Sequence, residues 1–431
     1  MAAMAADAGL EPRRAALRIL GQVREGRPFD AALDRAVGRL RDDDRRLAHE
    51  LAAGVLRRQR ELDHLLSPHI ERGWNAVKAP LQDVLRLGAY QLTALDRVPA
   101  HAAVDTSVRL AREVGGEKVG GFVNAVLRKV AGTARAPASD GSTASHPDWL
   151  VERWTERFGA EGAAKLVAWN DARPPLVVQP ARQSLEELQA RFAAAGLEVR
   201  LAPYGAGLIV PGGRPQELPG YEEGAFIVQD PAQALLAWFA DLPPDALVFD
   251  ACAAPGGKTI GLGRCVARVV AADVHRGRVR RLSENLRRAG SGRELAVVAD
   301  AAHVPLREGA VPVALLDAPC LGTGTFARHP DARHRVSAEA LAELAARQAV
   351  LLEETARVVR PGGLLLYATC SLEPEENERQ VDAFLERHPE FRREPPDAFP
   401  AALLSARGDL TIVPHRHGMD GAFAARLRRD G

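Results

Sequence analysis

Apolar residues recur at spacings of three and four along residues 12–130, a period that predicts amphipathic helices. The pattern is clearest in RRAALRILGQV, RRLAHELAAGVLRRQRELDHLL, LQDVLRLGAYQLTAL and VGGFVNAVLRKV. Proline residues stand in the gaps between these segments, where they interrupt the helical pattern. We therefore predict an all-helical domain over residues 1–135, with about five to seven helices.

The pattern changes twice after this domain. Residues 136–147 are rich in Ala, Gly, Ser and Pro, a composition that predicts an exposed linker. Residues 148–228 mix helical segments with short apolar runs such as PLVVQPA, GLIV and AFIVQ. This mixture predicts a small α/β subdomain that begins at residue 148.

From residue 229 to the end, apolar runs alternate regularly with loops and helical segments. The runs are ALVFDA, RVVAADV, LAVVAD, PVALLDA and GLLLYAT. Continuous apolar strands that alternate with helices are typical of a parallel sheet covered on both faces. We therefore expect residues 229–431 to form an α/β, Rossmann-like domain with a mostly parallel, doubly wound sheet.

Composition and charge narrow the class of protein. The chain of 431 residues contains no apolar run long enough to span a membrane, and acidic residues near its start argue against an export signal. Four cysteines without CxxC spacing make disulfides and metal sites unexpected and favour a reducing cytoplasm. Residues 1–130 hold 22 Lys and Arg against 17 Asp and Glu, which fits either a polyanionic partner or an ordinary surface. A monomer is expected.

The stretch FDACAAPGGKT, residues 249–259, follows a predicted strand and opens a predicted helix. A phosphate-binding P-loop would need glycine where Cys252 stands, and the G-x-G-x-x-G spacing of a dinucleotide site is absent. A tight turn of small residues instead favours a loop for S-adenosylmethionine, whose adenosyl group and carboxylate lie close to the backbone. The candidate cofactor residues of this loop are Cys252, Ala253, Ala254, Pro255, Gly256, Gly257 and Lys258.

Acidic residues stand at the ends of the next predicted strands. Asp273 follows the second strand and could accept both ribose hydroxyls, and Asp300 follows the third and could accept the adenine amino group. Asp317 ends the fourth strand. Each carboxylate taken alone could equally cap a following helix, but ligands of such sheets bind at this edge. All three acids are therefore assigned to the cofactor site.

Two cysteines also follow predicted strands. Cys320 lies in DAPCLGTGT and Cys370 lies in YATCS, so both thiols could reach one pocket if the two strands are close. A thiolate that adds to C6 of a pyrimidine makes C5 nucleophilic enough to attack a sulfonium methyl group. Asp317 could then hydrogen-bond the base at N3, and Lys258 could supply positive charge.

Four motifs, DACAAPGGKT, DAPCLGTGT, RHPDARHR and YATCSLEPEENE, closely resemble those of the RNA cytosine-C5 methyltransferases. The resemblance implies that Cys370 is the nucleophile and that Cys320 assists product release. Two positions depart from the family pattern, because Leu321 stands where serine is usual and Ala422 where phenylalanine is usual. Neither departure removes a catalytic group.

Residues 98–130 resemble the end of a NusB-like RNA-binding domain. A NusB-like domain ahead of this catalytic domain resembles the arrangement of the bacterial 16S rRNA cytosine-C5 methyltransferases of the RsmB or Fmu type. The implied substrate is 16S rRNA, naked or in an early small-subunit particle. Two alternatives stay open: another RNA such as tRNA, or a non-catalytic NusB-like RNA-binding factor.

Charged residues near the cysteines lead to two further expectations. Pro374 is predicted to begin a helix over PEENERQVDAFLERH, with Glu375, Glu376 and Glu378 stabilising its N-terminus. Basic residues after Cys320 are candidates for holding the RNA backbone, although a solvated loop would explain them as well. They are Arg328, His329, Arg333, His334 and Arg335.

Overall fold

The computed structural model describes residues 9–38, 40–132 and 145–431. Contacts between residues divide the chain into two compact units. The first contains residues 1–173 together with residues 326–335, and the second contains the rest of the chain. None of the described helices combines the length and the continuous apolar run that a bilayer-spanning helix needs.

Helices make up the first unit, as the three- and four-residue spacing predicts. Seven α-helices are present within the part of residues 9–132 that the structure describes, which confirms the predicted number. They are α2 (Glu11–Arg24), α3 (Phe29–Val37), α4 (Asp42–Arg57), α5 (Gln59–Leu66), α6 (Ala79–Ala94), α7 (Ala100–Gly115) and α8 (Glu117–Gly132). A further helix, α9 (Asp148–Asp171), is interrupted at Gly159, whose φ of 75° lies outside the helical region.

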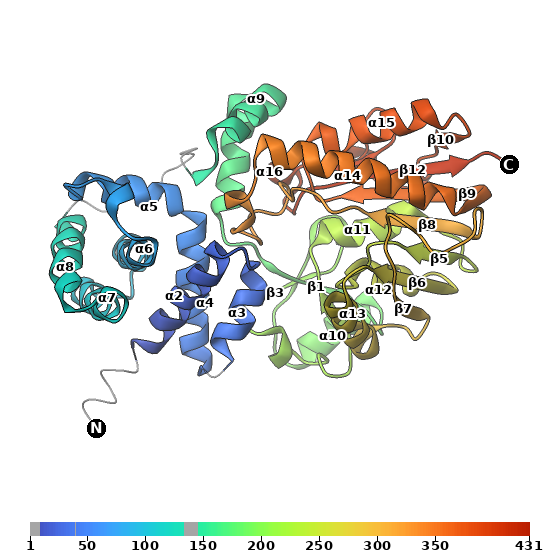
Figure 1. The fold of residues 1–431 in the computed structure, drawn as a ribbon. Coiled ribbons are helices and arrows are strands. Elements are labelled where there is room, and N and C mark those ends of the chain that lie inside the picture. Colours follow the sequence, from blue (N-terminus) through green and yellow to red (C-terminus); the bar gives the residue numbers. More distant parts are fainter. Residues whose placement is uncertain (1–8, 39, 133–144) are drawn as a thin grey trace. The chain divides into compact units, whose positions relative to one another are not determined.

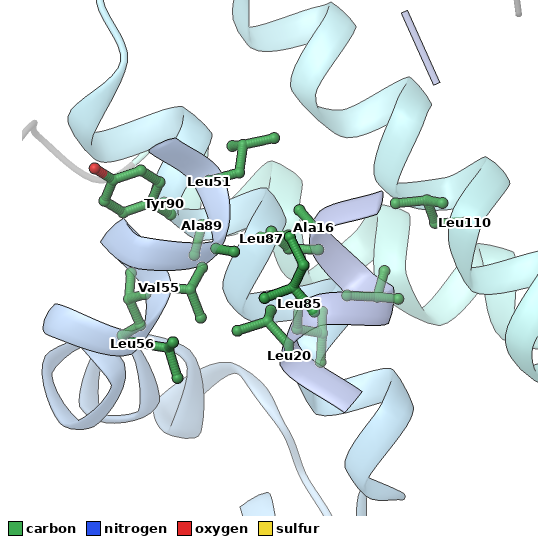
Figure 2. Packing of buried hydrophobic residues seen from close by; sticks show 14 of the residues in the cluster. Ala16, Leu20, Leu51, Val55, Leu56, Leu85, Leu87, Ala89, Tyr90 and Leu110 are labelled. Atoms are coloured by element: carbon green, nitrogen blue, oxygen red, sulfur yellow. The ribbon is translucent and has the colours of Figure 1, made fainter. Parts of the chain in front are cut away.

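The apolar faces of these helices form one core. Figure 2 shows side chains of α2, α4, α6 and α7 gathered between the helices, among them Leu20, Leu51 and Leu85. The ring of Tyr90 lies against Gly54, where a Cβ atom would come within 2.0 Å of it. The Tyr90 hydroxyl donates a hydrogen bond to Glu50 at 2.8 Å, so this large ring is buried without losing its polar partner.

The predicted linker, residues 136–147, falls mostly on residues 133–144, which lie outside the described residues. Its last described part is not exposed: Ser145 and His146 are buried. The Ser145 hydroxyl donates to Asp171 at 2.6 Å, and the His146 ring packs edge-on against Trp154. For these two residues the prediction of an exposed linker is wrong, because specific contacts outweigh their polar composition.

The second unit begins with a small antiparallel sheet of order β2-β3-β1-β4. Its strands are β1 (Leu176–Pro180), β2 (Arg200–Leu201), β3 (Leu208–Val210) and β4 (Phe226–Val228). The helix α10 (Leu185–Ala194) packs on it and begins with a capping box, in which Ser184 and Glu187 exchange hydrogen bonds. In the structure α9 belongs to the first unit, so residue 148 as a domain boundary stays a prediction.

The large sheet has eight strands, in the order β10-β12-β9-β8-β5-β6-β7, with β11 paired to β12. The strands β9 to β7 of this order run parallel, whereas β10, β11 and β12 pair antiparallel. Their bounds are β5 (Leu247–Asp250), β6 (Arg268–Asp273), β7 (Glu294–Val298), β8 (Val311–Asp317), β9 (Val359–Thr369), β10 (Phe391–Arg393), β11 (Leu410–Ile412) and β12 (Ala422–Arg429). The prediction of a mostly parallel sheet is confirmed.

Helices cover both faces of this sheet (Figure 1). The helices on one face are α11 (Pro231–Ala240), α12 (Gly257–Gly263) and α13 (Arg276–Ala289), and those on the other are α14 (Ala338–Arg357) and α15 (Glu378–Arg387). The short helix α16 (Pro414–His417) precedes β12. Alternate residues of 313–316 in β8 and of 364–368 in β9 face opposite layers, so these stretches are continuously apolar, as expected for a doubly covered sheet.

One of the basic residues predicted to bind RNA is buried inside the protein. Arg333 lies in the 326–335 segment of the first unit, and its side chain is fully buried. Its guanidinium pairs with Asp171 at 2.5 Å and donates to the carbonyl oxygens of Arg57 and Asn170. The prediction is wrong for Arg333, because its side chain is buried and paired with Asp171 inside the protein. For the other four basic residues it stays a prediction.

We expect Arg333→Leu to destabilise the first unit by about 3 kcal/mol, because removing one partner leaves Asp171 with an unpaired charge. Urea unfolding followed by tryptophan fluorescence measures this, since four of the five tryptophans lie in the first unit. Arg46→Leu is the control: it removes a solvent-exposed pair with Asp43, which contributes about 0–1 kcal/mol. Equal midpoints for the two variants would contradict the assigned role.

Candidate active site at the carboxyl end of the parallel sheet

Three carboxylates lie at one edge of the large sheet. Asp250, Asp273 and Asp317 are the last residues of β5, β6 and β8, which are neighbours in the order β8-β5-β6. Asp300 lies two residues beyond the end of β7 at Val298. The carboxyl edge of a parallel sheet is where such folds bind ligands, so the structure brings the predicted acids to a suitable place.

The segment between β5 and α12 forms the predicted tight turn. Ala253 N donates to Ala272 O at 2.8 Å, and the Asn285 side chain donates to Pro255 O at 2.9 Å. Gly256 has φ 108°, and a Cβ atom there would lie 2.7 Å from Leu282. Only glycine fits this position, and the turn keeps its backbone at the sheet edge, as a cofactor loop requires.

Asp250 was not among the predicted site residues, although it immediately precedes this turn. It is fully buried, and its Oδ2 accepts a hydrogen bond from Thr259 at 2.7 Å. Its Oδ1 has no hydrogen-bond partner in the part of the chain that the structure describes. Burial raises the pKa of Asp250 to about 7. A buried acceptor without a partner beneath the turn suits a ligand that carries donors or positive charge.

The two acids assigned to ribose and adenine differ in exposure. Asp273 is 3% exposed, and its Oδ1 accepts from His275 N at 2.9 Å and pairs with Arg278 at 3.1 Å. The Asp300 side chain is 47% exposed, and its Oδ1 accepts from Ala302 N at 2.9 Å. Both therefore also shape their own turns, and their cofactor roles stay predictions.

Lys258 pairs with Asp317. Its ammonium group lies 2.7 Å from Asp317 Oδ2, and both side chains are largely buried. Burial lowers the pKa of Lys258, but the attraction of Asp317, and also that of Cys370, raises it overall. The lysine therefore stays charged and holds the side chain of Asp317, which links two predicted site residues that are far apart in sequence.

The thiols of Cys320 and Cys370 meet. Their Sγ atoms lie 3.3 Å apart, because β8 and β9 are adjacent and parallel. The hydrogen bond to Cys370, and then burial, raise the pKa of Cys320 well above its ordinary value. Either thiol can be the donor of the hydrogen bond between the two sulfurs. The structure brings these residues together as expected, while their chemical roles stay predictions.

Of the remaining cysteines, Cys252 lies in the turn after β5. Burial, followed by the charge of Asp250, raises the pKa of Cys252 to about 12. This thiol stays protonated and unreactive, so the residue forms part of the wall of the site. Cys265 is exposed and lies on a surface turn after α12.

The predicted helix after Cys370 begins later than expected. Pro374–Glu376 is a single 3-10 turn, and α15 starts at Glu378. Glu376 is fully buried, and its carboxylate accepts a hydrogen bond from Leu321 N at 3.0 Å. The prediction that Glu376 stabilises a helix N-terminus is wrong, since the turn directs its side chain to the segment that contains Cys320.

Comparisons with known proteins identify the parts of the chain. Residues 10–132 match the NusB family, residues 146–214 match the RsmF/B-like ferredoxin-like domain, and residues 238–428 match the 16S rRNA methyltransferase RsmB/F family. The ribosomal RNA small subunit methyltransferase B of Thermus thermophilus is 37% identical over 97% of this chain and 98% of its own. A probable enzyme of the same name from Synechocystis is 35% identical over 93% and 95%.

Solved structures show the same fold. The crystal structure of PH0851 superposes with a TM-score of 0.83 at 26% identity, over 97% of this chain and 99% of that one. The family match defines a methyltransferase that uses S-adenosylmethionine. Because relatives match over nearly the full length, the chain belongs to the RsmB/F family of 16S rRNA methyltransferases.

A prediction follows from the 3.3 Å separation of the two sulfurs. Diamide should link Cys320 to Cys370, because a small shift brings the sulfurs to the bonding distance of about 2.05 Å. The thiols lose two electrons and two protons, and the diazene becomes a hydrazine. Mass mapping of unreduced peptides should show the linked pair, and dithiothreitol should reverse it.

Cys265→Ser is the control for this oxidation, because it removes the exposed thiol and should leave the cross-link unchanged. Recovery of only intermolecular disulfides would show that the two site thiols do not approach each other in solution.

Proposed function

We propose that this protein methylates C5 of a cytosine in 16S ribosomal RNA. The observation that carries the proposal is the pair of thiols, Cys320 and Cys370, whose sulfurs lie 3.3 Å apart at the sheet edge. Most methyl transfers need one nucleophile on the substrate and no cysteine at all. A carbon such as C5 of cytosine needs covalent activation, for which a thiolate is suited.

Cys370 is the proposed nucleophile. Its thiolate forms a bond to C6, and the electrons of the C5–C6 double bond move into the ring, which makes C5 nucleophilic. Asp317 is assigned to the base, where its carboxyl group hydrogen-bonds N3 and the exocyclic group and favours this electron shift. Lys258, 2.7 Å from Asp317, keeps that carboxylate in place and adds positive charge.

Cys320 is assigned to product release. A base removes the C5 proton, the electrons of the C5–H bond restore the C5–C6 double bond, and the C6–Sγ bond breaks. Cys370 leaves as a thiolate, which is stabilised when a neighbouring S–H group donates to it. The raised pKa of Cys320, caused first by its hydrogen bond to Cys370, supports the assignment, because it keeps this donor protonated.

S-adenosylmethionine supplies the methyl group as an electrophile when it is bound. We propose that the turn after β5 holds it, together with Asp273 at the ribose and Asp300 at the adenine. Support comes from the close-packed Gly256, which admits no side chain, and from the unpartnered Asp250 Oδ1 beneath the turn. Asp250 is added to the predicted set for this reason.

The substrate assignment rests on relatives named for ribosomal RNA and on the NusB family match of residues 10–132. A cytosine must leave its stack to reach thiols at the bottom of such a site, so a flexible or unpaired target is expected. The intact pair of thiols argues against a non-catalytic RNA-binding factor. A different RNA, such as tRNA, is an outcome that the following experiment distinguishes.

The test is incubation of the purified protein with labelled S-adenosylmethionine and either 16S rRNA or bulk tRNA. Mass spectrometry of nuclease digests should find 5-methylcytidine in the ribosomal RNA alone. Label in tRNA alone would change the assigned substrate from 16S rRNA to tRNA. Label on any base other than cytosine would overturn the proposed chemistry.

The two cysteines should give opposite phenotypes on replacement. Cys370→Ala should lose activity and form no covalent adduct, because the nucleophile is gone. Cys320→Ala should accumulate a protein–RNA adduct that survives a denaturing gel, because release of Cys370 is impaired. Cys252→Ala, which removes a protonated thiol of the same site, is the matched control and should accumulate none. An adduct with Cys370→Ala instead would reverse the assignment.

A further inference from the structure

A buried glutamate is hydrogen-bonded to the backbone of the segment that contains Cys320. Glu376 is fully buried, and its Oε1 accepts hydrogen bonds from Leu321 N at 3.0 Å and from the Gln348 side chain at 2.9 Å. Leu321 directly follows Cys320 in the chain. The carboxylate of Glu376 thereby fixes the peptide unit on one side of the cysteine.

Gln348 fixes the peptide unit on the other side. The same amide nitrogen that donates to Glu376 also donates to Pro319 O at 2.9 Å, and Pro319 directly precedes Cys320. Gln348 is fully buried on α14. Both backbone neighbours of Cys320 are therefore held by one pair of side chains that hydrogen-bond each other.

This pair is also tied to the strand that carries Cys370. The Tyr367 hydroxyl donates to Glu376 O at 2.7 Å, and Tyr367 is a buried residue of β9, three positions before Cys370. One polar network thus connects the segments of both cysteines from beneath. It sets the position of one sulfur relative to the other.

Stability of the local helix does not explain the buried carboxylate. The residue that precedes α15 is Asn377, and no side chain caps this helix. Burial raises the pKa of Glu376, which reflects the cost of holding a carboxylate in the interior. Such a cost is commonly met where a side chain positions reactive groups.

We propose that Glu376 is a positioning residue, which holds the Pro319–Leu321 segment so that the Cys320 thiol can assist release of the methylated base. The inference rests on the proposed function. In the release step the C6–Sγ bond breaks, its electrons go to Cys370, and the Cys320 S–H group donates to the departing thiolate. Among the described residues Glu376 hydrogen-bonds to the backbone N–H of Leu321 and to neither sulfur, so it acts through the backbone.

The test compares variants of the full chain with 16S rRNA and S-adenosylmethionine. Glu376→Ala removes the hydrogen bonds to Leu321 and Gln348, and Glu376→Gln keeps an oxygen that can accept both. Cys320→Ala is the reference for adduct accumulation. Glu375→Gln is the matched control, because this neighbouring glutamate pairs with the exposed Arg379. Each variant is assayed for kcat, for KM and for covalent adduct per folded protein on a denaturing gel.

We expect Glu376→Ala to accumulate the adduct as Cys320→Ala does, with kcat about 10- to 100-fold lower and KM for RNA unchanged, as for a displaced catalytic group. Glu376→Gln should restore kcat to within about threefold, and Glu375→Gln should match the unsubstituted protein. A merely structural role would lower the amount of folded protein without raising the adduct per molecule.

Gln348→Leu provides a second route should Glu376→Ala fail to fold. It removes the hydrogen bonds from Gln348 to Pro319 O and to Glu376, keeps the side-chain size, and should also accumulate adduct. Normal turnover without adduct in the folded variants overturns the inference while the proposed function stands. Absence of adduct in Cys320→Ala itself overturns the proposed release chemistry, and the inference falls with it. A Glu376→Gln variant as impaired as Glu376→Ala also contradicts positioning.

Discussion

The parallel pairing of β8 with β9 is the constraint on which the site depends. Asp317 lies opposite Ala368 in this register, so both strands end at the same edge and their next residues share one space. The segments beyond them are tied together, since Gly324 N donates to Cys370 O at 3.0 Å and Gly421 N donates to Gly324 O at 2.7 Å. A Cβ atom at Gly324 would meet both neighbours at 2.7 Å. The meeting of the thiols is therefore a property of the sheet.

The acids around this edge have different environments. Asp317 pairs with the ammonium group of Lys258 at 2.7 Å. Asp250 accepts a hydrogen bond from Thr259 at Oδ2, its Oδ1 has no partner among the described residues, and burial raises its pKa to about 7. The carboxylate of Glu376 accepts hydrogen bonds from the backbone of Leu321 and from the side chain of Gln348. The same side-chain chemistry thus meets a lysine, a threonine hydroxyl or a backbone N–H group, depending on where the fold places it.

Periodicity was a sound guide where local pattern and packing agree. The helices of residues 11–132 and the five parallel strands follow directly from it. It failed where a single long-range contact outweighs local preference. Arg333 is charged, yet its side chain is buried in an ion pair with Asp171. Glu376 has the sequence position of a residue at a helix N-terminus, yet its carboxylate accepts a hydrogen bond from Leu321 N. The partners are 162 residues apart for Arg333 and Asp171 and 55 residues apart for Glu376 and Leu321, so a local sequence pattern cannot reveal either contact.

The sequence by itself determined the elements, the family and the identity of the candidate groups, because motifs and apolar spacing are local properties. Only the tertiary structure decided which groups touch. The 3.3 Å between Cys320 and Cys370, the pairing of Lys258 with Asp317, and the direction of the Glu376 side chain each depend on strand order and backbone turns. YATCSLEPEENE places a cysteine among glutamates; the fold turns one of those glutamates toward the partner cysteine's backbone, because a buried carboxylate must find donors.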